Sequence, residues 1–340
     1  MSDFHRYDRQ IKLPEIGDFG QEKLKNAKVL IVGVGGLGCP AAQYLTAAGV
    51  GHIGLLDHDV VDITNLHRQI LFSEKHVGKR KAEVAKEVLS TQNSTVSFTT
   101  YTERLSDLNA LEILRSYDII LDGTDNFQTK YLINDASVLL DKPFVGASIY
   151  KYQGQISVFN YQGGPTYRCI YPNHHFKDNN NCEDTGVLGV LPGLMGVMQA
   201  TEAVKMILGI GKVLSGKMKL IDTLNHSEQF IQFKRNDVQI EMIKNRPLQL
   251  EQLTCELPAS GKTYLDVREP YEEPRPKHPN LISIPLNQIV ARQAEIPKDK
   301  EIHVFCQSGI RSKKAIALLE KEFGFTNLAN VDGGIEILIQ

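Results

Sequence analysis

A glycine-rich turn between an apolar strand and a helix most constrains the fold of this 340-residue chain. The turn, Gly33-Val34-Gly35-Gly36-Leu37-Gly38, follows the apolar run 28–33 and precedes a helical segment at 39–48. A second apolar strand follows at 52–57. Strand, tight turn, helix and strand in this order predict a βαβ unit whose parallel strands are buried on both faces.

The same unit accounts for a stretch from Val29 to Leu56 that contains no Asp, Glu, Lys or Arg. The stretch is long enough to cross a bilayer, but its glycines divide it into strand, helix and strand. We therefore expect no membrane partner. Because the first residues also lack an apolar signal segment, we expect a cytoplasmic protein.

Strands and helices continue to alternate along the chain, which predicts an α/β fold with a Rossmann-like, mostly parallel sheet. A boundary is expected near 236–250 and is placed after residue 240, where polar residues and Pro247 interrupt the pattern. A second, smaller α/β domain then follows. The further expected helices are 79–90, 107–116, 127–141 and 312–324, and the further strands are 96–101, 118–122, 143–148, 263–269 and 301–306.

Composition excludes two classes of protein. Lys and Arg number 38 against 40 Asp and Glu, a net charge of −2, so the basic excess of a nucleic-acid-binding protein is missing and no nucleic-acid partner is expected. Five cysteines are too few, and odd in number, for a disulfide framework, which favours a reducing compartment.

The glycine turn has the chemistry of a nucleotide site. Gly33, Gly35, Gly36 and Gly38 let the backbone approach a phosphate, and the following helix N-terminus favours an anion. Asp57 ends the next strand, where a carboxylate can bind ribose hydroxyls. These features fit an NAD-dependent oxidoreductase as well as they fit an enzyme that uses a mononucleotide.

Further charged residues favour nucleotidyl or phosphoryl transfer over hydride transfer. Arg9 lies in RYDRQ, Arg68 in NLHRQ and Lys81 in GKRK, and Asp125 lies in GTDN just after a predicted strand. Fixed cations stabilise negative charge that develops on a phosphate, and an aspartate can hold Mg²⁺. Hydride transfer does not need such a set.

The motifs RYDRQ, GVGGLG, LLDHDVVDITNLHRQ, GKRK and TDN, in this order, resemble the MoeB/ThiF/HesA family, bacterial relatives of ubiquitin-activating enzymes, over about residues 4–235. The resemblance implies ATP-dependent adenylation of the C-terminal Gly-Gly carboxylate of a small ubiquitin-like sulfur carrier protein. It also implies a homodimer in which Arg9 reaches into the partner's site. The implied contacts are ribose with Asp57, phosphates with Asn65, Arg68 and Lys81, and magnesium with Asp125.

Two features of the cysteines can be compared with the same family. Cys182, in the polar stretch 161–184, resembles the loop cysteine that forms a covalent link to the carrier in some members; an inert surface cysteine is the alternative. The family's two zinc-binding C-x-x-C pairs are not kept, because 166–169 retains only Cys169 and 234–244 has no cysteine. We expect no structural zinc, a buried Cys169 and a core position for Cys39.

A second thiol site is predicted at Cys306, which ends an apolar strand and precedes QSGIRS and a helix. Backbone N–H groups and a helix N-terminus lower the pKa of a thiol, and Arg311 adds a cation. LDVRE, SIPL, CQSGIRS and VDGGI resemble rhodanese sulfurtransferases over about 258–340, which implies a persulfide on Cys306. The family's usual Trp is replaced by Leu338, near the end of the chain.

The resemblances together imply an adenylation domain over 1–240 and a small rhodanese-like domain over 241–340. The expected reaction uses ATP and Mg²⁺, with no zinc, and converts a carrier carboxylate into a thiocarboxylate, with a sulfur donor such as a cysteine desulfurase. The molybdopterin carrier is favoured by analogy, and thiamine and tRNA-thiolation carriers are alternatives. An NAD-dependent oxidoreductase and a non-catalytic module that only docks carriers are the other two classes.

Overall fold

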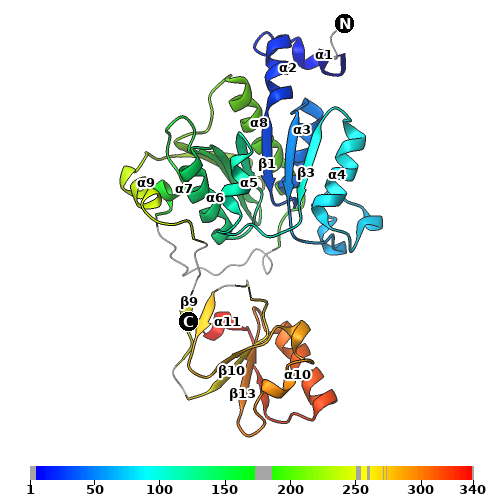
Figure 1. Ribbon diagram of the computed structural model, residues 1–340, viewed down its shortest axis with the longest axis vertical. Helices are drawn as coiled ribbons and strands as arrows, with labels where there is room; N and C mark the ends of the chain where they lie inside the picture. Colours follow the sequence, from blue (N-terminus) through cyan, green and yellow to red (C-terminus); the bar gives the residue numbers. More distant parts are fainter. Residues whose placement is uncertain are drawn as a thin grey trace. The chain divides into compact units, whose positions relative to one another are not determined.

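A computed structural model describes residues 5–172, 186–249, 254–258, 261–270, 272 and 274–338. The chain divides into two compact units, Met1–Leu250 and Glu251–Gln340 (Figure 1). The boundary expected at residue 240 falls inside helix α9 (Asp237–Lys244). Ile240 and Ile243 of this helix pack with Val138 of the first unit, which is why the first unit continues beyond residue 240.

The first unit is built on an eight-stranded sheet in the order β3-β2-β1-β4-β5-β6-β7-β8. Five strands pair in parallel and confirm the predicted Rossmann-like sheet: β1 (Lys28–Val32), β2 (His52–Leu56), β3 (Ser97–Tyr101), β4 (Ile119–Asp122) and β5 (Phe144–Tyr150). The sheet continues in antiparallel fashion, which the sequence pattern did not indicate, through β6 (Gln153–Phe159), β7 (Lys217–Asp222) and β8 (Ser227–Gln232).

Helices cover both faces of this sheet (Figure 1). Val29 and Ile31 of β1 belong to the core under one set of helices, and Leu30 and Val32 belong to the core under the other. Successive side chains of a strand point to opposite faces, so a strand buried on both sides reads as a continuous apolar run. The first set is α2 (Gly17–Asn26), α3 (Gly38–Ala48), α4 (Lys81–Gln92) and α8 (Val190–Leu208), and the second is α5 (Ala110–Arg115) and α6 (Phe127–Leu140).

The apolar stretch from Val29 to Leu56 is the β1–α3–β2 unit. Among the described residues, no helix has both the length and the apolar character that a bilayer crossing requires. Short helices complete the first unit: η1 (His5–Tyr7) and α1 (Asp8–Ile11) precede α2, η2 (Ile63–Asn65) and η3 (Glu74–His76) lie between β2 and α4, and α7 (Tyr167–Ile170) follows β6.

The second unit is a small α/β fold, as predicted. Its parallel sheet has the order β12-β10-β13-β14, and a core of Leu265, Val304, Ala315 and Leu319 joins the sheet to α10 (Ile310–Phe323). The strands of this sheet are β10 (Thr263–Asp266), β12 (Leu281–Ser283), β13 (Ile302–Phe305) and β14 (Leu328–Asn330). A separate pair consists of β9 (Thr254–Glu256) and β11 (Arg275–Lys277). The short helices are η4 (Leu286–Gln288), η5 (Gln293–Glu295) and α11 (Ile335–Leu338).

Candidate functional site

The glycine turn joins β1 to α3 through contacts that side chains would block. Gly33 has φ +89°, and a Cβ there would lie 2.9 Å from the carbonyl oxygen of Gly123. A Cβ on Gly38 would lie 2.0 Å from the carbonyl oxygen of Gly33. The turn is therefore tightly closed at the N-terminus of an 11-residue helix, an arrangement that binds phosphate through backbone N–H groups.

Asp57 follows β2 and faces this turn. Its Oδ2 accepts the N–H of Val34 at 2.8 Å, and its Oδ1 accepts the N–H of Asp59 at 2.9 Å. Burial raises the pKa of Asp57, while the charge of Lys81 and the bond from Asp59 act in the opposite direction. Each carboxylate oxygen retains a lone pair for a ribose hydroxyl.

Lys81 begins α4 beside Asp57 and is 6% exposed. Its Nζ lies 3.1 Å from Oδ2 of Asp59, and Nε2 of His58 lies 3.3 Å from Oδ1 of the same carboxylate. Asp57, His58 and Asp59 can bring three ligand atoms within 4.8 Å of one another, the one such group in the described part of the chain. Asp125, the predicted magnesium ligand, does not belong to this group.

Asn65 and Arg68 lie in the segment between β2 and α4. Asn65 takes part in the capping box of η2 with Asp62. Arg68 donates to the carbonyl of Thr64 at 3.2 Å, and its Cγ lies 3.6 Å from where a Cβ on Gly36 would be. Arg68 therefore lies beside the glycine turn.

Asp125 is exposed in the turn that joins β4 to α6. The N–H of Gly123 donates to the carbonyl of Val32 at 2.8 Å, so this turn packs against the glycine turn. The site lies where β1 has β2 on one side and β4 on the other, the point at which open α/β sheets bind ligands. The structure thus brings the glycine turn, Asp57, Arg68, Lys81 and Asp125 to one edge of the sheet.

Arg9 is not brought to this edge within its own chain. Beside it, Tyr7 accepts from Asn93 Nδ2 at 2.8 Å and Gln10 donates to the carbonyl of Ala48 at 3.2 Å. Ala48 is the last residue of α3, whereas the glycine turn lies at the other end, about 16 Å away for a helix of this length. The hydrogen bonds of Tyr7 and Gln10 therefore hold α1 near the C-terminal end of α3, away from the glycine turn, and Arg9 is exposed.

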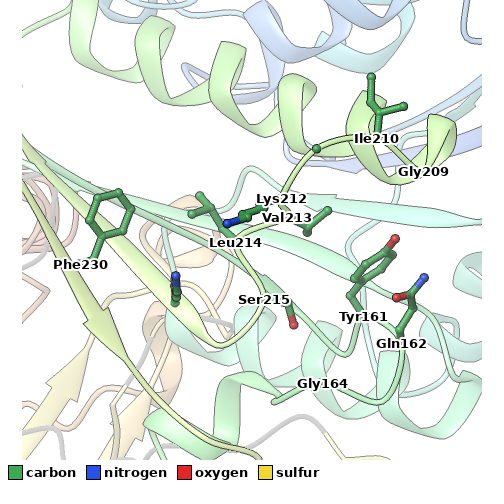
Figure 2. Close-up of a pocket in the computed structure, with 12 residues that line it drawn as sticks. Tyr161, Gln162, Gly164, Gly209, Ile210, Lys212, Val213, Leu214, Ser215 and Phe230 are labelled. Atoms are coloured by element: carbon green, nitrogen blue, oxygen red, sulfur yellow. The ribbon is translucent and has the colours of Figure 1, made fainter. Parts of the chain in front are cut away.

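A pocket of about 830 Å³ lies in the antiparallel half of the sheet. Figure 2 shows Tyr161 and Gln162 on one side of it and Leu214 and Phe230 toward the other. None of the predicted site residues lines this pocket.

In the second unit, Cys306 follows β13 and lies under the start of α10. It is 1% exposed, and its Sγ accepts the N–H of Gly309 at 3.1 Å. Burial alone would raise the pKa of this thiol, but bonds from Ser312, Ser308 and Gly309 lower it below its usual value. The VDGGI motif lies against this loop, since the N–H of Ile335 donates to the carbonyl of Cys306 at 2.9 Å.

Arg311 forms a two-point ion pair with Glu272, with both N–O distances at 2.5 Å. Arg311 was expected to be a fixed cation, and Glu272, whose carboxylate compensates that charge, was not predicted. No spacing rule links positions 272 and 311, because only the fold brings the two segments together. The signal available was the position of Glu272 three residues after the LDVRE motif.

The remaining cysteines differ in accessibility. Cys39 is fully buried, as predicted. Cys169 is only partly buried, which corrects the expected burial; its Sγ accepts N–H groups from Thr166 at 3.3 Å and Asn236 at 3.2 Å. The described residues around Cys169 supply no zinc ligand set. Cys182 lies outside the described residues.

Comparison with known proteins identifies both units. The ThiF family model matches residues 7–242, and the model of the rhodanese-like domain matches residues 250–337. Adenylyltransferase and sulfurtransferase MOCS3-1 of Drosophila pseudoobscura pseudoobscura is 38% identical, over 98% of this chain and 82% of the relative. Adenylyltransferase and sulfurtransferase MOCS3 of Culex quinquefasciatus is 38% identical, over 97% of this chain and 86% of the relative.

Solved structures agree for the first unit. The crystal structure of E. coli MccB with ATP aligns with a TM-score of 0.62 and 27% identity, over 69% of this chain and 73% of that chain. The structure of E. coli MccB with MccA-N7isoASN aligns with a TM-score of 0.62 and 27% identity, over 69% and 74%.

Proposed function

The chain belongs to the ThiF family, and on this premise we propose that it adenylates the C-terminal Gly-Gly carboxylate of a small ubiquitin-like sulfur carrier protein and then converts it to a thiocarboxylate. The enzyme is an adenylyltransferase and sulfurtransferase in one chain, which sets aside the NAD-dependent oxidoreductase and the non-catalytic module. The observation that carries the proposal is the meeting of the glycine turn, Asp57, Arg68, Lys81 and Asp125 at one sheet edge.

Adenylation activates a carboxylate whose own leaving group, oxide, is too poor for direct substitution by sulfur. A carboxylate oxygen of the carrier attacks the α-phosphorus of ATP, the bond to the bridging oxygen breaks, and pyrophosphate leaves. The glycine turn and the N-terminus of α3 hold phosphate oxygens, and Asp57 holds the ribose. The product is an acyl adenylate with AMP as the leaving group.

Three side chains stabilise the charge that develops at phosphorus. Arg68 and Lys81 supply fixed positive charge and Asn65 a hydrogen-bond donor, groups that are preorganised and need no rearrangement as the reaction proceeds. Asp125 would hold magnesium, which when bound neutralises the phosphate oxygens. The partner subunit of a homodimer supplies a further Arg9, which accounts for the distance between Arg9 and the glycine turn of its own chain.

Sulfur transfer uses the thiol of the second unit. A sulfur donor such as a cysteine desulfurase places a persulfide on Cys306, where backbone N–H groups stabilise negative charge. The terminal sulfur attacks the acyl carbon and AMP leaves, which gives a carrier–enzyme acyl disulfide. An external thiol then attacks Sγ of Cys306, releases the thiocarboxylate and leaves a mixed disulfide that a second such thiol reduces. Cys182 is the sequence candidate for a covalent link to the carrier.

The pathway and location belong to the same proposal. A molybdopterin-synthase carrier is favoured by analogy with MoeB-like proteins that carry a rhodanese domain, and thiamine or tRNA-thiolation carriers are the alternatives. We propose a cytoplasmic location, where unpaired thiols such as Cys39, Cys169 and Cys306 stay reduced.

Intact mass spectrometry tests the reaction directly. Each Gly-Gly carrier of the same organism is incubated with the enzyme, ATP, Mg²⁺ and thiosulfate or a loaded cysteine desulfurase. Replacement of one carboxylate oxygen by sulfur supports the proposal, and the carrier that reacts identifies the pathway. The matched control is Cys306→Ser, which should retain ATP–pyrophosphate exchange and lose the mass change. No exchange with any carrier would contradict adenylation.

A further inference from the structure

A buried ion pair lies beneath the turn that carries Asp125. Lys130 of α6 and Asp122 at the end of β4 are 4% and 1% exposed, and Nζ lies 2.9 Å from Oδ2. Because neither side chain reaches the surface, neither can contact ATP or a carrier. Their contribution to the reaction must pass through other residues.

The hydrogen bonds of this pair converge on the turn. Oδ1 of Asp122 accepts both the N–H of Thr124 at 3.0 Å and its hydroxyl at 2.6 Å. Lys130 also donates to the carbonyl of Ala147, on β5, at 2.9 Å. The residue before Asp125 is thus held by Asp122, and Asp122 is held by α6 and, through Lys130, by β5.

Two further bonds complete the support. Gln199 of α8 donates to the carbonyl of Asp122 at 2.7 Å. On the other side of the turn, Asn126 caps α6 by accepting the N–H of Thr129 at 2.9 Å. Asp125 therefore stands between two fixed neighbours, Thr124 and Asn126, although its own side chain is exposed.

Stability alone does not explain such a pair. Apolar residues of similar volume often replace a buried ion pair with no loss of stability, and in some proteins a buried polar or ionic group instead fixes one conformation. Here the neighbours on α6, Tyr131 and Leu132, are buried in an apolar core. An apolar side chain at position 130 could not donate to Asp122, and that carboxylate would then be buried without its cationic partner.

We propose that Lys130 is a positioning residue for adenylation: through Asp122 and Thr124 it fixes the direction in which Asp125 presents its carboxylate to the divalent cation bound with ATP. This inference rests on the proposed function, since that function places magnesium at Asp125. Side chains that orient a metal ligand without touching the metal commonly change metal affinity or activity about 10- to 100-fold when they are replaced.

The test uses the full-length protein and a double variant, Lys130→Met with Asp122→Asn, which removes both charges and leaves neither one buried alone. Mn²⁺ binding is followed by electron paramagnetic resonance with α,β-methylene-ATP and no carrier. The half-saturating Mn²⁺ concentration should rise about 10-fold or more, and Lys130→Arg, which keeps the charge and the bond to Asp122, should stay close to wild type.

A second readout needs neither metal nor nucleotide. Hydrogen–deuterium exchange of the metal-free protein should be faster in the double variant at the Thr124 amide, in peptides that cover 119–129. Thr124→Val removes only the hydroxyl bond at 2.6 Å and should give a smaller rise in half-saturating Mn²⁺. This variant keeps the inference testable if the double variant does not fold.

The matched control is Arg168→Met, which removes a buried partner of Asp135 five residues further along α6. Asp135 retains Arg246 as a partner, so the protein should fold with lower stability but wild-type Mn²⁺ binding and turn exchange. Wild-type values in the double variant, or a loss that Arg168→Met reproduces and Lys130→Arg does not rescue, would overturn the positioning role. Absence of ATP–pyrophosphate exchange in wild type would instead count against the proposed function.

Discussion

Oδ2 of Asp57 accepts the N–H of Val34 at 2.8 Å, which ties the end of β2 to the glycine turn after β1. The bond joins two segments 23 residues apart and sets the distance between the expected ribose and phosphate contacts. Burial raises the pKa of Asp57, and the nearby charge of Lys81 opposes this effect. This one hydrogen bond therefore links the residues expected to contact ribose and phosphate.

Replacing Arg68 by alanine should abolish most adenylation without unfolding the protein. Arg68 is partly exposed beside Gly36, and loss of one contact to developing charge costs about 2.7–4 kcal/mol, or roughly 10²- to 10³-fold in rate. ATP–pyrophosphate exchange measures the change, with Arg235→Ala as a control because Arg235 pairs with Asp237 and contacts Gly163. Equal exchange in Arg68→Ala and wild type would refute the role given to Arg68.

Gly33→Ala should weaken nucleotide binding and stability together. The backbone at Gly33 has φ +89°, and the added Cβ would lie 2.9 Å from the Gly123 carbonyl. Left-handed backbone costs an L-residue about 1–2 kcal/mol before that clash is counted. Thermal unfolding with and without ATP measures both effects. Gly193→Ala, where a Cβ meets nothing within 4 Å, should leave both unchanged or gain up to about 1 kcal/mol of helix stability.

Cys306 should react with iodoacetamide at a lower pH than an ordinary thiol. Hydrogen bonds lower its pKa despite burial, so the midpoint of the rate–pH curve should lie below the usual value of about 8.5. Because the folded pKa is below the unfolded one, the corresponding stability is present above the unfolded pKa and is lost as pH falls through the folded pKa. Peptide mass spectrometry measures the rates.

The same experiment contains its own reference. Burial raises the pKa of Cys39 to about 12, so this thiol should remain unmodified in the folded protein. Ser312→Ala removes a donor to Cys306 and should move the Cys306 midpoint to higher pH. An equal Cys306 midpoint in Ser312→Ala and wild type would show that the hydroxyl does not stabilise the thiolate.

Two inactive variants should restore each other if Arg9 acts across a dimer. Arg9→Ala and Arg68→Ala affect different chains of one site, so a mixed dimer contains one intact site of two. When equal amounts are mixed and the subunits redistribute, half of the dimers are mixed. ATP–pyrophosphate exchange should then recover to about a quarter of the wild-type activity. No recovery, with mixed dimers confirmed by native mass spectrometry, would place Arg9 outside the partner's site.

Purified protein should hold far less than one zinc per chain, and chelator should not change its unfolding temperature. Cys169 accepts N–H groups from Thr166 and Asn236, so hydrogen bonds link the segments on which the family's two cysteine pairs would lie. Cys169→Ala should cost about 1 kcal/mol or somewhat more, because these donors lose their acceptor. Elemental analysis that finds one tightly held zinc per chain would contradict this prediction.

The parallel half of the sheet and the strand–turn–helix course of the glycine turn could be predicted from the sequence alone. Apolar runs such as 28–33 and 118–122, each followed by a turn and a helix, can be recognised locally because burial on both faces leaves a continuous apolar signature. The antiparallel strands β6, β7 and β8 were not predicted. All six residues of β8 are exposed, so this edge strand carries no burial pattern that periodicity could detect.

The pairing of distant charges could not be predicted, because it follows from how the chain packs. No local sequence pattern indicates that Lys130 and Asp122 are buried, yet the fold buries them together beneath Asp125. Likewise Arg311 meets Glu272, 39 positions away, and Arg9 is held about one helix length from its own glycine turn. Local patterns report burial and backbone conformation, whereas the pairing of distant charges depends on how strands and helices pack, and that information is not local.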